Sequence, residues 1–235
     1  MFLVVRRNSI IMIALICCFS YISYLVFARN DVPATANPPA EYILIDPGHG
    51  GEDGGAVGVS GSEEKMLNLA VALELKSLCE AAEIPIIMTR ETDISLGDPN
   101  KTTIAARKKD DMYKRKELAE RVNTKAYIGV HMNFFEESKY RGAQVFYSPD
   151  NDDSRVLGEI LQARLLAGIN DGNTRTAHVA DKGIFLLNDV SVPSIIIECG
   201  MLSNHEEEQL LSDPAYQKLL AECIFKGIQE FISKN

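Results

Sequence analysis

The stretch that decides the fold is Tyr42-Ile-Leu-Ile-Asp-Pro-Gly-His-Gly-Gly-Glu-Asp-Gly-Gly-Ala56. Its apolar start is short enough to be a buried strand that ends at Asp46, and Pro47-Gly48 predicts a turn directly afterwards. His49 follows on a loop that contains five glycines between positions 48 and 55. Because open α/β sheets bind ligands beyond the carboxyl ends of their strands, we expect this loop to carry His49 into a site.

Short apolar runs and longer amphipathic segments alternate along the rest of the chain. Strands are expected at residues 42–46, 85–89, 126–131, 142–147, 183–187 and 194–199. Helices are expected near residues 62–82, 103–122, 155–169, 204–211 and 216–232. The sequence therefore predicts an α/β fold, a single-domain three-layer sandwich in which helices flank a mostly parallel or mixed central sheet.

The sequence predicts three local features of these helices. Ser62 is a good N-cap for the first helix. The helix at 103–122 is highly charged, and we expect it to face solvent, with a narrow apolar stripe made by Ile104, Met112, Leu118 and Val122. The acidic run at 206–208 is most simply a solvated helix start.

The N-terminal 28 residues differ in composition from the remainder. Residues 10–28 are almost unbroken apolar sequence, just long enough to span a bilayer, and Arg6 and Arg7 precede them. Residues 1–28 are thus either a cleaved signal sequence or an uncleaved membrane anchor, and the length favours the anchor. Because the arginines keep the N-terminus cytoplasmic, the remainder is expected to be exported. Residues 29–40 form a Pro/Ala linker, which leaves residues 41–235 for one folded domain.

Composition excludes two other kinds of protein. The net charge of −9 argues against nucleic-acid binding, because no basic patch is present to neutralise phosphates. The domain contains three cysteines, Cys79, Cys199 and Cys223, and an odd number excludes a complete disulfide framework. Their apolar surroundings in the sequence predict buried free thiols.

Four residues form a candidate catalytic set. His49 and His131 end or follow predicted strands, and Glu64 lies in the first turn of the helix after the Gly-rich loop. Two imidazoles and one carboxylate recur in catalytic zinc sites, where the fourth position is left to water. Glu198 interrupts a run of isoleucines at the end of a strand, where a carboxylate is costly to bury without a partner or a function. It is the candidate base.

Each of these residues also has an ordinary explanation when taken alone. A histidine after a strand can be structural, Glu64 can complement the helix dipole, and Glu198 can be an ion-paired or capping acid. The Gly-rich loop could cradle a phosphate, but it lacks the Gly-Lys-Ser/Thr ending of a P-loop.

The joint pattern is more specific than any single motif. It comprises Ile45-Asp-Pro-Gly-His-Gly-Gly51, Glu64-Lys65, Asn68-Leu69, Thr89-Arg90, Asp93, Arg115, Arg121, Ile128-Gly-Val-His-Met-Asn133 and Pro193-Ser-Ile-Ile-Ile-Glu-Cys-Gly-Met-Leu-Ser-Asn204. In motif order and spacing, residues 42–232 resemble the zinc-dependent N-acetylmuramoyl-L-alanine amidases (the amidase_3 family). Gly129-Val130, Met132 and Met201 depart from the usual family residues, and we interpret them as packing changes beside the site.

The resemblance implies a function for each candidate residue. His49, Glu64 and His131 would be the ligands of one zinc ion, and Glu198 would be the catalytic carboxylate. The implied reaction is hydrolysis of the amide between muramic acid and L-alanine of the stem peptide in peptidoglycan, which makes residues 41–235 a catalytic amidase domain. The compact chain looks most like the sporulation and germination subclass, which acts in spore cortex maturation through muramic δ-lactam. The implied partners are peptidoglycan glycan strands with stem peptides, a membrane reached through the N-terminal segment, and a separate activating protein. The implied location is extracytoplasmic, in the cell wall or the spore intermembrane space.

Two competing hypotheses remain open at this stage. A zinc peptidase on a related fold would need an arginine clamp for a substrate carboxylate, for which Arg90, Arg115 and Arg121 are candidates. A non-catalytic peptidoglycan-binding protein could keep the fold, but binding alone requires neither an open metal site nor Glu198.

Overall fold

The computed structural model describes residues 41–121, 123–169 and 172–234. The predicted signal or anchor at 1–28 and the linker at 29–40 lie outside these residues. Within the described ranges, no helix is both long enough and apolar enough to cross a membrane.

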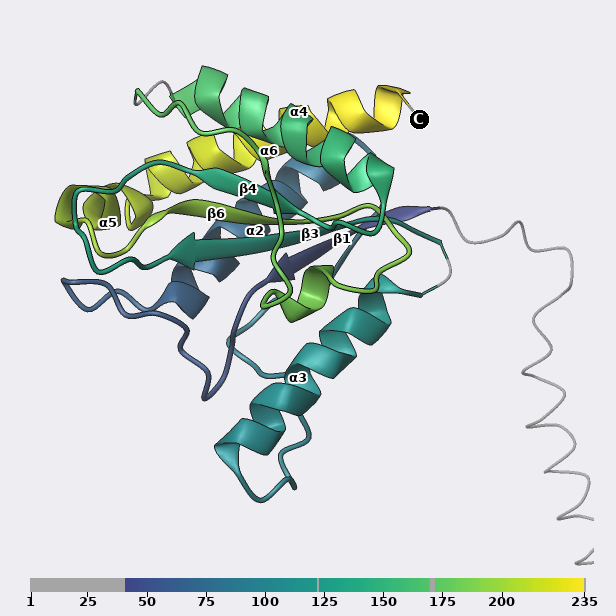
Figure 1. The fold of residues 1–235 in the computed structure, drawn as a ribbon, viewed down its shortest axis with the longest axis vertical. Helices are drawn as coiled ribbons and strands as arrows, with labels where there is room; N and C mark the ends of the chain where they lie inside the picture. The colour runs from purple at the N-terminus through teal and green to yellow at the C-terminus, as the bar shows by residue number, and fades with distance from the viewer. Residues whose placement is uncertain (1–40, 122, 170–171, 235) are drawn as a thin grey trace, which may run out of the picture. The chain divides into compact units, whose positions relative to one another are not determined.

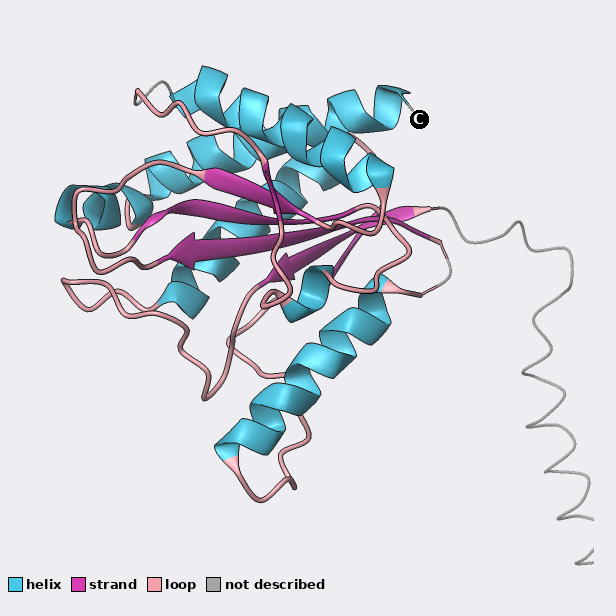
Figure 2. Cartoon of the chain, in the orientation of Figure 1, coloured by secondary structure: helices cyan, strands magenta, loops and turns pink. Residues whose placement is uncertain are grey.

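A six-stranded mixed sheet forms the middle layer, with strand order β2-β1-β3-β6-β4-β5 (Figures 1 and 2). Its strands are β1 (Tyr42–Pro47), β2 (Ile86–Met88), β3 (Thr124–Asn133), β4 (Gln144–Tyr147), β5 (His178–Val179) and β6 (Ser194–Met201). Neighbouring strands among β2, β1, β3 and β6 are parallel, whereas β4 runs antiparallel to β6. The central strands read as nearly continuous apolar runs because both faces of the sheet are covered.

Helices cover both faces, which confirms the predicted three-layer α/β sandwich. The larger core lies between the sheet and α2 (Glu64–Ala81), α4 (Asp152–Ile169) and α6 (Pro214–Lys234). On the other face, α3 (Ile104–Ala119) and the short 3-10 helix η1 (Phe185–Leu187) cover a smaller core around Leu44, Tyr127 and Ile196. Figure 1 shows α3 on the opposite side of the sheet from α4 and α6. The seven-residue α5 (His205–Leu211) follows β6.

The first long helix is not capped by Ser62, contrary to the prediction. It begins at Glu64, and Glu63 is the N-cap residue without a side-chain hydrogen bond to the helix. Carbonyls of the Gly-rich loop satisfy the first helical N–H groups instead, because Glu64 N donates to Ala56 O at 2.9 Å and Lys65 N donates to Gly54 O at 3.1 Å. The loop therefore both carries His49 and caps the helix that carries Glu64.

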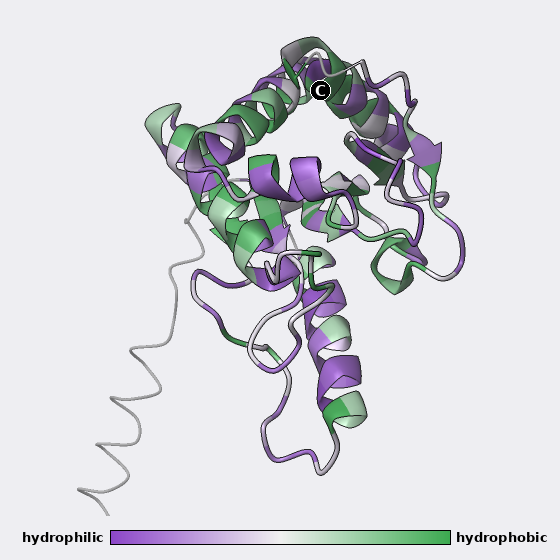
Figure 3. Ribbon diagram, turned by 90° about the vertical axis from the view of Figure 1, so that its left-hand side faces the viewer, coloured by the Kyte–Doolittle hydropathy of each residue, from purple (hydrophilic) through white to green (hydrophobic). Residues whose placement is uncertain are grey.

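The apolar stripe predicted for α3 is only partly confirmed, because Leu118 packs against the smaller core while Val122 lies outside the described residues. Ile104 and Met112 are 54% and 39% exposed, and the buried residues of this helix are Arg115 and Ala119. Figure 3 shows hydrophilic colour along much of α3. The helix is held to the body by the buried Arg115 together with a short apolar contact at Leu118 and Ala119. A search for apolar periodicity missed the contribution of the buried cation.

The segment at 183–187 is not a strand. Asp181 accepts the Gly183 N–H through its side chain at 2.6 Å and the Ile184 N–H through its carbonyl at 3.2 Å, so the chain turns here. The turn ends in η1, which buries Leu187 in the smaller core. The edge strand on this side of the sheet is instead β5, a two-residue strand beside β4. A short apolar run does not by itself distinguish a strand from another buried segment.

The cysteine prediction is confirmed. Cys79, Cys199 and Cys223 are buried free thiols.

Candidate metal and catalytic site

Three side chains converge at the carboxyl end of the parallel strands. His49 Nε2 lies 3.2 Å from Glu64 Oε2, and His131 Nδ1 lies 3.0 Å from Glu64 Oε1. One potential ligand atom from each of the three residues lies within 4.8 Å of the others. Two imidazoles and a carboxylate are the donor types of a catalytic zinc site, and this spacing fits a single metal ion. The predicted convergence of His49, Glu64 and His131 is therefore confirmed.

The backbone of the Gly-rich loop is adapted to this convergence. His49 itself adopts a φ of 63°, a left-handed conformation that is uncommon for a residue with a side chain. A Cβ at Gly48 would overlap the His131 ring, and a Cβ at Gly55, whose φ is 69°, would crowd the Glu64 carboxylate. The two glycines let the loop backbone lie directly against the ligand side chains.

Acidic groups surround His49. Its Nδ1 atom lies 3.0 Å from Asp53 Oδ2, on the opposite side of the ring from Glu64. Burial opposes protonation, but hydrogen bonds to Asp53 and Glu64 raise the pKa of His49 to about 9. An imidazole stabilised as a cation between two carboxylates lies in an environment that also favours a metal cation. Lys108 of α3 pairs with the same Asp53 carboxylate at 2.6 Å.

The Glu64 carboxylate is also held in place by the protein. It accepts hydrogen bonds from Ala56 N at 2.8 Å and Met132 N at 3.2 Å. Asn68, one turn later on α2, donates to it at 3.3 Å and also to Gly48 O at 3.2 Å. Burial alone would raise the pKa of Glu64, but the two histidines hold it well below its usual range. Glu64 is thus preorganised as an anion.

Glu198 lies beside this cluster. In the sheet register it is the direct neighbour of His131 on β3 and of Gln144 on β4. Part of its side chain reaches solvent, but its Oε2 atom is buried and has no hydrogen-bond partner within the described residues. Burial raises the pKa of Glu198 to about 7, and the electrostatic effect of His131 offsets only part of this increase. A carboxyl group that titrates near neutrality is suited to proton transfer.

The arginine clamp considered for a peptidase is not formed by Arg90 and Arg115. Arg90 is buried and donates to the carbonyls of Pro47 at 2.9 Å, Gly48 at 2.9 Å and Lys65 at 2.7 Å. Arg115 is buried against Asp46 and donates to His49 O at 2.7 Å. Both guanidinium groups are occupied in holding the loop around His49.

The anchor of Arg115 is Asp46, a fully buried carboxylate at the end of β1. It also accepts hydrogen bonds from Thr89 and Tyr127, both at 2.5 Å. Burial opposes ionisation, yet Arg115 and these two hydroxyls hold the pKa of Asp46 below its usual range. The Asp in the opening motif was a sequence signal for a buried partner, because a charge at the end of a buried strand must be paired.

The acidic run on α5 is a solvated helix start only at Glu206, which is exposed, and the burial of the other two acids corrects the sequence prediction. Glu207 and Glu208 are both 1% exposed. Glu207 accepts the N–H groups of Gly142 at 2.6 Å and Met201 at 2.8 Å. Glu208 accepts those of Ser60 at 2.7 Å and Ser62 at 3.1 Å. Glu207 therefore joins the loop before β4 to the end of β6, and Glu208 fastens the loop before α2 to α5.

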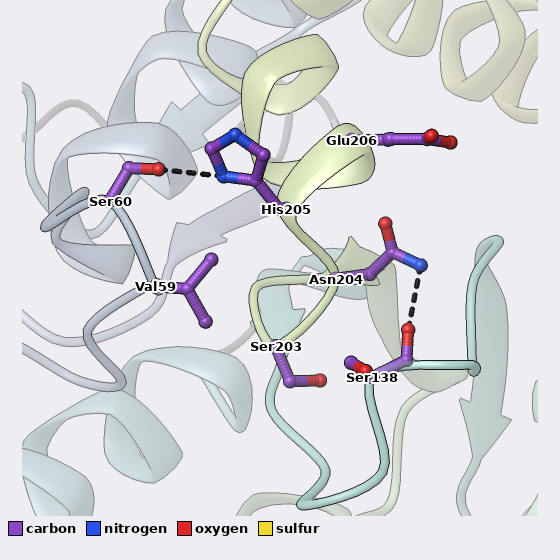
Figure 4. Close-up of a pocket in the computed structure, with 7 residues that line it drawn as sticks. All are labelled: Val59, Ser60, Ser138, Ser203, Asn204, His205 and Glu206. Carbon is purple, nitrogen blue, oxygen red and sulfur yellow. Dashed lines mark hydrogen bonds between the residues drawn. The ribbon is translucent and has the colours of Figure 1, made fainter.

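A polar pocket of about 590 Å³ lies between the 59–60 loop and the start of α5 (Figure 4). Figure 4 shows two hydrogen bonds across it, Ser60 Oγ to His205 Nδ1 at 3.0 Å and Asn204 Nδ2 to Ser138 O at 2.8 Å. Its lining includes neither Glu198 nor the three clustered residues.

The sequence comparison decides the family. The profile of the Amidase_3 family, described as N-acetylmuramoyl-L-alanine amidase, matches residues 43–230. The chain belongs to this family. It is therefore an enzyme of the N-acetylmuramoyl-L-alanine amidase class, as the motifs predicted.

Individual relatives of this amidase family agree with the assignment. The chain is 32% identical to the germination-specific N-acetylmuramoyl-L-alanine amidase of Bacillus subtilis, over 89% of this chain and 88% of that protein. It is similar in structure to the CwlD amidase of Clostridioides difficile, solved in complex with the GerS lipoprotein, with a TM-score of 0.79 and 39% identity over 83% of this chain and all of that chain. The catalytic domain of CwlV from Bacillus (Paenibacillus) polymyxa gives a TM-score of 0.71 at 25% identity, over 82% of this chain and 98% of that one.

Proposed function

We propose that this amidase hydrolyses the amide between the lactyl group of N-acetylmuramic acid and L-alanine of the peptidoglycan stem peptide, with one zinc ion. The observation that carries the proposal is the position of Glu198, whose buried Oε2 atom has no hydrogen-bond partner among the described residues, directly beside the convergent His49, Glu64 and His131. Membership of the amidase family supports the substrate.

The proposed chemistry assigns one task to each part of the site. His49, Glu64 and His131 would hold the zinc ion. When bound in such a site, zinc polarises a carbonyl and makes a water molecule more acidic. Glu198 takes a proton from the attacking water and then donates it to the amine of L-alanine as that amine leaves. The ionised form of Glu198 is needed for the first step and the protonated form for the second, and the proton taken from water converts one form into the other.

We also propose a role in spore cortex maturation, through muramic δ-lactam, and an extracytoplasmic location. The germination-specific relative from Bacillus subtilis supports the cortex role. The basic and apolar composition of residues 1–28 supports export with a membrane anchor. A separate activating protein is part of the proposal, because the similar CwlD amidase was solved in complex with a lipoprotein.

The test incubates the full-length chain, loaded with zinc, with peptidoglycan and identifies the products by mass spectrometry. We expect new L-alanine amino termini and glycan without peptides, and loss of both after chelation. Glu198→Gln should bind zinc but lose turnover, whereas Glu159→Gln, at an exposed position on α4, should keep it. Cleavage inside the peptide would instead establish a peptidase. A Glu198→Gln variant with full activity would contradict the assigned base.

A further inference from the structure

Arg90 and Arg115, two of the arginines considered for a carboxylate clamp, are structural, but two other arginines line a separate pocket close to Glu198. A cavity of about 240 Å³ is lined by Lys139, Arg141 and Arg175 together with Tyr140 and the 172–174 turn. This lining carries three cationic side chains and no acidic one, in a chain with a net charge of −9. A cluster of cations on an otherwise acidic protein concentrates anions locally.

Two of the three cations of this basic pocket, Arg141 and Arg175, have no carboxylate partner among the described residues. Arg175 donates to the carbonyls of Arg141 and Gly142, both at 2.6 Å, and to no carboxylate among the described residues. Arg141 has no hydrogen bond or ion pair from its guanidinium within the same residues. Lys139 pairs with Glu137, but both are more than half exposed, and exposed pairs of this kind contribute little.

The position of the pocket relative to Glu198 follows from the sheet. Arg141 lies three residues before Gln144, and Gln144 is the register partner of Glu198. Three residues span at most about 11 Å, and paired Cα atoms across antiparallel strands are about 5 Å apart. The Cα atom of Arg141 is thus within about 16 Å of that of Glu198. A substrate group one or two residues beyond the scissile amide can span this range.

The chemistry of the pocket selects one part of the substrate. An arginine guanidinium binds a carboxylate through two parallel N–H groups, which gives both charge and geometric recognition. The lactyl carboxyl of muramic acid is consumed in the scissile amide, so the neutral glycan offers no charge at this point. We propose that the basic pocket of Lys139, Arg141 and Arg175 binds a free carboxylate of the stem peptide, beyond L-alanine. This assignment rests on the proposed function.

The size of the cavity agrees with such a ligand. Pockets that enclose a drug-sized molecule have volumes of about 300 to 1,000 Å³. A volume of about 240 Å³ is smaller and suits one acidic residue rather than a disaccharide. The pocket therefore selects among stem peptides by the charge of one residue and leaves the glycan to other surfaces.

The test compares two muropeptides that differ at one group. In one, the second stem residue has a free α-carboxylate, and in the other this carboxylate is amidated. We expect the full-length enzyme to show a kcat/KM about tenfold higher for the free carboxylate, equivalent to about 1.4 kcal/mol. Arg141→Gln should remove most of this preference and keep the rate on the amidated substrate within about twofold. Unchanged activity on the amidated substrate also shows that the variant is folded.

Arg155→Gln on α4 is the matched control, because Arg155 is exposed and pairs only with Glu159 among the described residues. It should retain the full preference. Equal rates of the wild type on both substrates, or an equal loss on both in Arg141→Gln, would overturn the pocket assignment and leave the amidase function intact.

A binding measurement separates the two proposals if neither substrate is cleaved by the zinc-loaded wild type. That result would overturn the proposed function. Fluorescence anisotropy with labelled muropeptides would then test the pocket alone. Tighter binding of the free carboxylate, lost in Arg141→Gln, supports the pocket, and equal binding of both peptides refutes it.

Discussion

Replacing Glu198 with glutamine is expected to stabilise the metal-free protein at alkaline pH while it abolishes turnover. The pKa of Glu198 is raised from 4.5 to about 7, chiefly by burial. A raised pKa means that the folded protein favours the protonated carboxyl. The stability that the protonated Glu198 carboxyl contributes is therefore fully present below pH 4.5 and is lost as the pH rises through about 7. Glutamine has a similar shape and no proton to lose, so its contribution does not change with pH.

The magnitude follows from these two pKa values. Compared with a side chain that stays neutral, Glu198 lowers the free energy of unfolding by about 1 kcal/mol at pH 5 and by about 3 kcal/mol at pH 8. The stability advantage of Glu198→Gln should therefore grow by about 2 kcal/mol between pH 5 and pH 8. For a domain of this size, that corresponds to a growth of about 4 to 8 °C in the Tm difference.

The assay is urea unfolding of wild type and Glu198→Gln at both pH values, followed by circular dichroism. Both proteins are chelated first, because a cation bound at His49, Glu64 and His131 would stabilise the Glu198 carboxylate and lower its pKa. Any constant cost of burying the amide cancels, since only the change in the difference with pH is used. A difference in unfolding free energy that stays the same from pH 5 to pH 8 would refute the reasoning.

Two further substitutions test how the metal cluster is held. Asp53→Asn keeps a hydrogen-bonding group beside His49 but removes the negative charge. We expect metal affinity, measured in competition with a chromophoric chelator, to fall about 10- to 100-fold. Unchanged affinity would show that Asp53 does not orient the His49 ring for metal binding. Gly48→Ala places a Cβ in the His131 ring and should abolish metal binding, while Gly54→Ala, whose Cβ would have its nearest neighbour at 3.6 Å, should keep it. Equal metal binding by the two alanine variants would contradict the close approach.

The sequence predicts best those strands that are buried on both faces of the sheet. β1, β3 and β6 read as continuous apolar runs because helices cover both faces of the sheet there. Residues 183–187 look similar in sequence, yet the Asp181 turn makes them a 3-10 helix, and β5 has only two residues to signal its presence. Apolar character alone reports burial and not backbone conformation.

The same distinction explains which parts of the site could be predicted. His49 and His131 are visible because each follows a strand, and strand ends in an α/β sheet meet at one edge. The polar contacts that hold this edge in place cannot be recognised from the sequence. Arg115 lies in a helix that reads as solvent-facing, and its partner Asp46 is 69 residues away. Because polar groups pair through long-range contacts without any sequence period, pattern analysis does not locate them.

The acidic pair on α5 also determines when the site can be completed during synthesis. His49, Glu64 and His131 all belong to the first 131 residues, so the whole cluster leaves the ribosome before α5 is made. The loop that leads into Glu64, however, is fastened by Glu208, which lies 146 and 148 residues beyond its two hydrogen-bond donors. Contacts of such separation close late, because a long loop must be ordered before they form. The loop that leads into Glu64 thus gains this attachment only after residue 208 has been added.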